Sequence, residues 1–192
     1  TRGRGLPDRA LARRIDVERT FRRRAFEARR LVQHRDDEVA PLLKPLGARF
    51  YPVLYLLTRM GESRDWGTGL PLKASLLGKM SRLEVHHVFP KAQLYKRNYR
   101  RPEVNALANF CFLTKDTNLH ITDRLPEEYF PKIEAAHKGA LASQWIPDDP
   151  ALWKIERFRD FLEARKVLLA AELNRRMEEL LHGDVRWLAG AA

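Results

Sequence analysis

Two short apolar runs stand out in a chain whose other apolar residues mostly recur at helical spacing. The first, residues 84–90, contains the neighbouring pair His86 and His87 and is stopped by a proline. The second follows Asn109 and leads into polar residues, up to Asn118, with the turn and cap chemistry of a helix start. We therefore expect the order strand, connection, strand, helix. Because successive side chains of a strand point to opposite faces, the two histidines cannot share one role.

Helical spacing dominates the remaining apolar positions. It predicts a buried core helix over residues 50–61, a short helix over 72–80, a helical turn over 103–108 and a long amphipathic helix over 151–182 that braces the core. Pro126, followed by two glutamates, marks the start of a further helix. The fold class that follows is α+β and mostly α-helical.

Residues 1–45 differ from the rest because many arginines separate their apolar positions and no strand pattern occurs. We interpret them as a basic helical arm or linker, and residues 46–192 as a separate domain. The arm can contact DNA or act as a hinge; alternatively, it is a solvated connector whose apolar face packs on another domain. Because Thr1 is not a natural start, we expect a fragment of a longer chain with a missing upstream domain.

The charge balance indicates a polyanionic partner. Lys and Arg number 36 against 25 Asp and Glu, a formal net charge of +11, and the pI is about 10.1. Nucleic acid fits this charge best. An anionic membrane surface fits less well, because the positive charge is spread over several segments. An ordinary basic protein without such a partner is the other alternative.

Neither a membrane span nor a nucleotide-binding loop is indicated. No apolar run is long enough to cross a bilayer, and the arginine-rich start lacks the hydrophobic core of a signal peptide. We therefore expect a cytoplasmic protein with no membrane partner. A Gly-x-x-x-x-Gly-Lys-Ser/Thr motif is absent, so we assign no nucleotide site to this chain.

The single cysteine, Cys111, excludes an internal disulfide and a Cys-x-x-Cys metal clip. We expect it to be a small buried residue of the second strand and not a nucleophile. Any metal must then bind imidazole, amide and carboxylate groups. Such ligands suit Mg²⁺ or Mn²⁺, and Zn²⁺ or Ni²⁺ as the softer possibility.

The histidine pair, followed by a hydrophobic residue and a proline and then by two asparagines nine positions apart, resembles the HNH (ββα-metal) endonucleases. Residues 83–90, 104–109 and 117–129 are similar, more specifically, to the C-terminal nuclease half of GmrSD-type modification-dependent restriction proteins. The resemblance implies helices around a small ββα-metal module that nicks or cleaves DNA as the effector of an anti-phage restriction system. It also implies an upstream nucleotide-hydrolysing sensor domain in a longer parent chain.

An imidazole titrates close enough to neutral pH to accept a proton from water. By the resemblance, His87 is this general base, while His86 and the amide oxygen of Asn118 bind the metal. Asn109 would fix the loop that carries the base or orient the His87 ring through a hydrogen bond. A histidine at the ligand position favours Mn²⁺ or another transition metal over strict dependence on Mg²⁺. Asp116 is expected to cap the helix or, alternatively, to support the site.

Cations interleaved with Tyr95 and Tyr99 lie between the two strands and suit contacts to phosphate together with stacking. Solvated side chains would give the same pattern. The candidate DNA-binding residues are Lys91, Lys96, Arg97, Arg100, Arg101, Lys115, His120 and Arg124.

A function of another class is an alternative to the nuclease. The chain can be a basic DNA-binding or regulatory interaction module whose nuclease site is degenerate. Loss of nicking in a His87 variant would separate the two.

Overall fold

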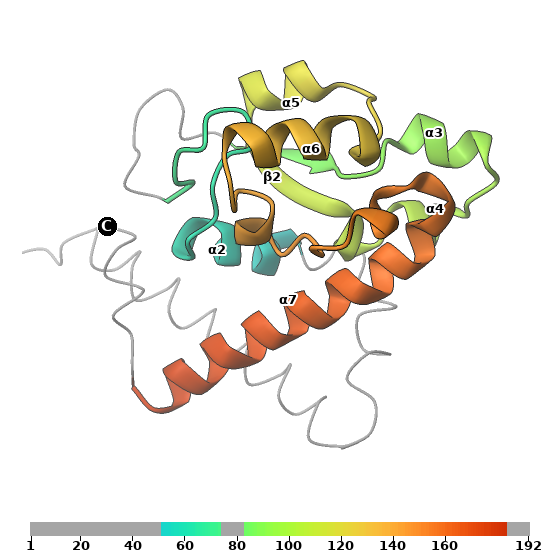
Figure 1. The fold of residues 1–192 in the computed structure, drawn as a ribbon. Helices are drawn as coiled ribbons and strands as arrows, with labels where there is room; N and C mark the ends of the chain where they lie inside the picture. The colour runs from blue at the N-terminus through green and yellow to red at the C-terminus, as the bar shows by residue number, and fades with distance from the viewer. Residues whose placement is uncertain (1–50, 74–82, 184–192) are drawn as a thin grey trace, which may run out of the picture. The chain divides into compact units, whose positions relative to one another are not determined.

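The computed structural model describes residues 51–73 and 83–183 (Figure 1). The predicted arm, residues 1–45, and most of the predicted helix over 72–80 lie outside these ranges, and Leu72 and Lys73 are not helical. All described residues belong to one of two compact units into which the chain divides, Leu43–Ala192.

The two predicted strands form an antiparallel pair. Strand β1 (Leu83–His87) pairs with β2 (Phe110–Thr114), and His86 is the register partner of Cys111. Every residue of β2 is buried, whereas in β1 only His86 is buried and Val85 is 43% exposed. The sheet therefore has one strand in the core and one near the surface.

Helix α5 (Lys115–Ile121) follows β2 directly, which confirms the predicted strand-to-helix junction. Its N-cap is Thr114, whose hydroxyl accepts a hydrogen bond from the backbone N–H of Thr117. The expectation that Asp116 caps this helix is wrong. Asp116 is exposed in the first turn, where its carboxylate faces the favourable end of the helix dipole.

The connection between the strands is mostly helical. It contains α3 (Lys91–Lys96), α4 (Arg101–Val104) and the 3-10 helix η4 (Leu107–Asn109). Pro90 precedes α3, and Pro102 lies in the first turn of α4, where its missing N–H costs nothing. The predicted turn over residues 103–108 is thus the end of one helix and the start of another.

The predicted core helix over 50–61 is confirmed as α2 (Tyr51–Met60), with Leu54 and Leu57 buried. Its aromatic side chains pack on β2. The ring of Tyr51 meets that of Phe110 edge to face, with centroids 4.5 Å apart. This packing covers one face of the buried strand.

The C-terminal part begins with α6 (Pro126–Ala136), at the predicted proline, and ends with α7 (Phe158–Leu181). Between them lie the 3-10 helices η5 (Ala142–Gln144), η6 (Pro150–Trp153) and η7 (Ile155–Arg157). The predicted helix over 151–182 therefore starts seven residues too early. A 3-10 helix repeats every three residues, so its apolar spacing is easily taken for that of an α-helix.

Helix α7 contacts η4, η6 and η7 and crosses below the strands in Figure 1. Phe89, which follows β1 and has no exposed surface, packs against the rings of Phe158 and Phe161, at centroid distances of 5.1 and 4.9 Å. Burial of one phenylalanine contributes roughly 1.5–3 kcal/mol. The end of β1 is thus anchored on α7.

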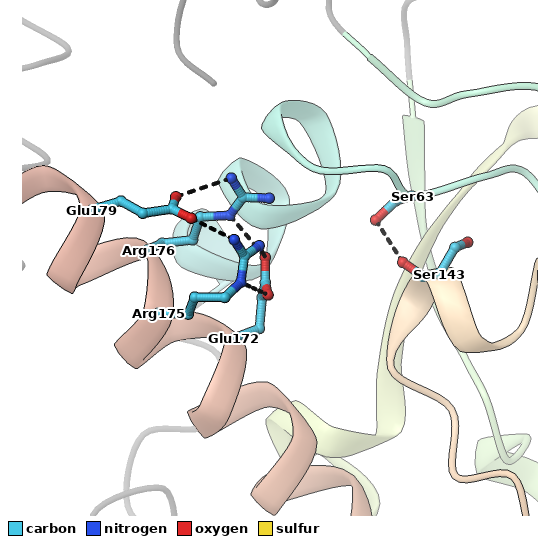
Figure 2. A network of polar contacts seen from close by, with 6 residues as sticks. All are labelled: Ser63, Ser143, Glu172, Arg175, Arg176 and Glu179. Carbon is cyan, nitrogen blue, oxygen red and sulfur yellow. Dashed lines mark hydrogen bonds and ion pairs between the residues drawn. The ribbon is translucent and has the colours of Figure 1, made fainter. Parts of the chain in front are cut away.

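Figure 2 shows two further sets of polar contacts, one between two segments of the chain and one within α7. The hydroxyl of Ser63 donates to the backbone carbonyl of Ser143 at 3.1 Å, which ties the loop after α2 to η5. On α7, Glu172 pairs with Arg175 and Arg176 at 2.7 and 2.8 Å. Because Arg175 is half exposed, its pair contributes at most about 1 kcal/mol.

The predicted class is confirmed at this level: a mostly helical α+β fold with a two-stranded antiparallel sheet in the described ranges. Among the helices described, none combines the length and the apolar character needed to cross a membrane.

Candidate active site

His86 is buried, with 4% of its surface exposed, on the face of β1 that looks toward α5. Its Nδ1 lies 2.8 Å from the side-chain oxygen Oδ1 of Asn118, in the first turn of α5. The rings of Trp66 and Tyr129 enclose it edge-on, with centroids 6.1 and 6.3 Å away. The structure thus brings two predicted metal ligands, His86 and Asn118, into direct contact.

Burial lowers the pKa of His86 from 6.5 to about 4, against the opposing effect of its hydrogen bond to Asn118. The positive charges of His87 and Arg165 lower it further. The imidazole is therefore neutral at pH 7, with Nδ1–H donating to the Asn118 oxygen and the lone pair on Nε2. Its other nitrogen, Nε2, has no hydrogen-bond partner among the described residues.

Glu84 completes a chain of three side chains, although it was not among the predicted site residues. Its carboxylate accepts a hydrogen bond from Nδ2 of Asn118 at 2.8 Å. Glu84 and His86 are two residues apart on β1 and so share one face of the strand. This spacing was the available signal in the sequence.

His87 points to the opposite face, where its ring lies 4.4 Å from that of Phe110. It is half-buried, and Nε2 lies 3.4 Å from Oδ1 of Asn105. Asn105 donates its own amide N–H to the carbonyl of Arg101 at 3.1 Å, so its oxygen is turned toward His87. Nε2–H then donates to Asn105, and Nδ1 is left as the proton acceptor.

Burial is the main reason that the pKa of His87 is lowered from its ordinary value of 6.5. The hydrogen bond to Asn105 raises this pKa and the nearby ammonium of Lys91 lowers it. At neutral pH the ring is therefore mostly in the form that can accept a proton. Asn105 was not predicted as a site residue, because nothing in the sequence marks a contact across this connection.

Asn109 fixes the loop that follows His87. Its Oδ1 accepts from the backbone N–H of Phe89 at 2.8 Å, and its Nδ2 donates to the carbonyls of Phe89 and Val104 at 3.2 and 2.9 Å. Asn109 is fully buried. These contacts correspond to the expected role of fixing the loop. The other expected role, a hydrogen bond to the His87 ring, belongs to Asn105 instead.

Asp65 holds the start of α5 from a distant part of the chain. Its buried carboxylate accepts from the backbone N–H of Thr114 at 2.9 Å and from the hydroxyl of Thr117 at 2.5 Å. The adjacent Gly67 leaves room for this contact, because a Cβ there would lie 2.4 Å from the Thr117 hydroxyl. Asp65 therefore helps to place Asn118, and the sequence offers no signal for it.

The predicted DNA-binding residues fall into two groups. Those of the connection are exposed around α3 and α4, two helices in contact, and Lys91 lies close enough to His87 to affect its pKa. Lys115 and His120 are exposed on α5. Arg124 is half-buried and donates to the carbonyls of His120 and Ile121 at the end of that helix. The exposed members of the first group are Lys91, Lys96, Arg97, Arg100 and Arg101.

The donor atoms present fit a small divalent ion. Adjacent ligands of an octahedral ion with bonds of about 2.1 Å lie about 3 Å apart, and Nδ1 of His86 and Oδ1 of Asn118 are 2.8 Å apart. The two atoms share a hydrogen bond here, so an ion would bind both of them only with the ring proton moved from Nδ1 to Nε2. Within residues 51–73 and 83–183, no group of three or more His, Cys, Asp or Glu side chains is arranged to hold a metal. An ion here would take most of its ligands from water and phosphate.

Comparisons of the chain with protein-family models, curated proteins and solved structures give no significant match.

Proposed function

We propose that this chain is a metal-dependent endonuclease that hydrolyses phosphodiester bonds in DNA, with β1, β2 and α5 as a ββα-metal module. The observation that carries the proposal is the 2.8 Å contact between His86 and Asn118, beside a His87 whose ring keeps one nitrogen as acceptor. An imidazole and an amide oxygen at the spacing of neighbouring metal ligands, next to a neutral histidine, suit hydrolysis of a phosphate ester.

In this proposal His86 and Asn118 would hold a divalent ion, Mg²⁺ or Mn²⁺, with Zn²⁺ or Ni²⁺ as further candidates. The imidazole ligand favours Mn²⁺ over Mg²⁺. When bound, the ion would neutralise charge on the phosphate and stabilise the leaving oxygen. The lowered pKa of His86 keeps its ring neutral across the physiological pH range, and an ion bound at Nδ1 would leave the ring proton on Nε2.

His87 acts as the general base by accepting a proton from water at Nδ1. The Asn105 oxygen, 3.4 Å from Nε2, selects the tautomer and stabilises the imidazolium that forms. Asn109 is a positioning residue, because its hydrogen bonds hold the backbone at Phe89, two residues beyond the base. Arg165 supports the same junction from α7, by donating to the carbonyls of Ala108 and Phe110.

The proposed substrate is DNA because of the charge of the chain and the cations near the base. The net charge is +11, and Lys91 starts the helix that follows His87 and Pro90. Lys96, Arg97, Arg100 and Arg101 extend the basic surface along α3 and α4. The resemblance to GmrSD-type proteins extends the proposal to an effector of anti-phage restriction.

Nicking of supercoiled plasmid in Mn²⁺ tests the proposal. The unmodified chain should convert supercoiled to open-circular DNA, EDTA should stop the reaction, and His87→Ala should slow it by about 10²–10⁴-fold. His182→Ala is the matched control, because His182 is exposed at the end of α7. Equal nicking by the His87→Ala and His182→Ala variants would overturn the assignment of the base.

The second candidate is a DNA-binding or regulatory module with a degenerate nuclease site. The observation that favours it is the lack of a three-residue His, Cys, Asp and Glu cluster in the described ranges. It predicts DNA binding that weakens steeply with salt but no nicking in any of the four metals. The plasmid assay and a salt titration of DNA binding together separate the two candidates.

A further inference from the structure

Glu84 and His86 share one face of β1, and the side chain of Asn118 reaches between them from α5. The carboxylate of Glu84 is 2.8 Å from one end of the Asn118 amide, and Nδ1 of His86 is 2.8 Å from the other end. Glu84 is half-buried, so water competes only in part for this hydrogen bond. The three groups form a continuous chain across the junction of β1 and α5.

The chemistry of a carboxylate decides how the amide is turned. An ionised carboxylate only accepts hydrogen bonds, so the NH₂ group of Asn118 must face Glu84 and its oxygen must face His86. The reverse orientation would place the amide oxygen against the negative charge. The orientation that presents an oxygen ligand beside His86 is therefore set by Glu84.

We infer that Glu84 is a positioning residue that presents the Asn118 oxygen to a divalent cation at His86. This inference rests on the proposed function for the presence of the cation, but not for the orientation of the amide. Partners that hold a metal ligand in place typically contribute 10–100-fold to metal affinity.

Mn²⁺ affinity, measured by calorimetry on Glu84 variants, tests the inference. Glu84→Ala should weaken Mn²⁺ binding by about 10–100-fold. Glu84→Gln should retain more affinity, because its side-chain oxygen still accepts from Asn118. Glu127→Ala, on the exposed first turn of α6, controls for the lost charge and should bind like the unmodified chain.

The effect of Glu84→Ala on Mn²⁺ affinity should also be measured in an Asn118→Asp variant. The result distinguishes a positioning role of Glu84 from a purely structural one. The carboxylate introduced by this substitution has two equivalent oxygens, so no partner is needed to orient it, and Glu84 now repels it. Removal of Glu84 should then leave Mn²⁺ affinity unchanged or increase it. Equal weakening by Glu84→Ala on both backgrounds would overturn the positioning role.

The metal-free protein gives an independent measurement. In NMR spectra the NH₂ protons of Asn118 should be shifted downfield by the carboxylate, and Glu84→Ala should remove that shift. NH₂ protons of Asn118 that show no downfield shift, and whose chemical shift is unchanged by Glu84→Ala, would refute the inference. If the unmodified chain bound no Mn²⁺ while the shift was present, the proposed metal site would fail and the orientation by Glu84 would stand.

Discussion

Replacement of Asn109 by alanine would remove the side chain that holds the chain together just after the histidine pair. Asn109 has no exposed surface, and its amide makes three hydrogen bonds to the backbone of Phe89 and Val104, at 2.8, 3.2 and 2.9 Å. Alanine leaves one buried N–H and two buried carbonyls without these partners. Within the part of the chain that the structure describes, no other side chain hydrogen-bonds to these three groups.

The expected loss of stability follows from the three backbone groups that lose their partners. A buried donor or acceptor that loses its partner costs about 1–3 kcal/mol. The N–H of Phe89 has a single hydrogen to donate and should lie at the upper end, whereas carbonyls tolerate the loss better. We expect the free energy of unfolding to fall by about 4 kcal/mol, a large part of the roughly 5–15 kcal/mol typical of a domain.

Urea unfolding followed by circular dichroism measures this change. Asn174→Ala is the matched control, because Asn174 is exposed on α7 and alanine has the higher helix propensity, so stability should change by under about 0.7 kcal/mol. A loss below about 1 kcal/mol in the Asn109→Ala variant would refute the reasoning. It would mean that water or a rearranged backbone satisfies the groups around Phe89.

Four further outcomes are expected. The nicking rate should rise with pH until the pKa of His87, which burial places below 6.5, and then level off, because only the neutral ring accepts a proton. Asn105→Ala should move that midpoint to lower pH, since its hydrogen bond raises the pKa; an unchanged pH–rate profile would exclude the contact. The Cys111 thiol, fully buried and with its pKa raised by burial, should react with a chromogenic disulfide reagent in urea but not in the native protein; rapid native reaction would contradict that burial. Gly67→Ala should lower the free energy of unfolding by about 1–3 kcal/mol, because the new methyl group would meet the Thr117 hydroxyl at 2.4 Å; an unchanged urea midpoint would show that this junction yields freely.

Several elements could be predicted from the sequence because their causes are local. The apolar run around the histidine pair, the proline that stops it and the buried run after Asn109 predict β1 and β2 without any distant contact. Pro126 with two glutamates behind it predicts the start of α6 in the same way. Alternation along a strand predicts that His86 and His87 lie on opposite faces. Their rings indeed contact different residues, Trp66 and Phe110.

Contacts between distant residues were decided by the tertiary structure. Asp65 reaches the start of α5 across 49 residues to Thr114, and no local pattern announces such a partner. Asn105 and Asn109 have the same chemistry, and packing alone determines that the first meets the His87 ring and the second holds the backbone. The sequence by itself therefore determined which segments are strands and helices and which polar residues follow them. The tertiary structure decided which polar groups meet, because a hydrogen bond depends on position to a fraction of an ångström and hydrophobic periodicity carries no information at that scale.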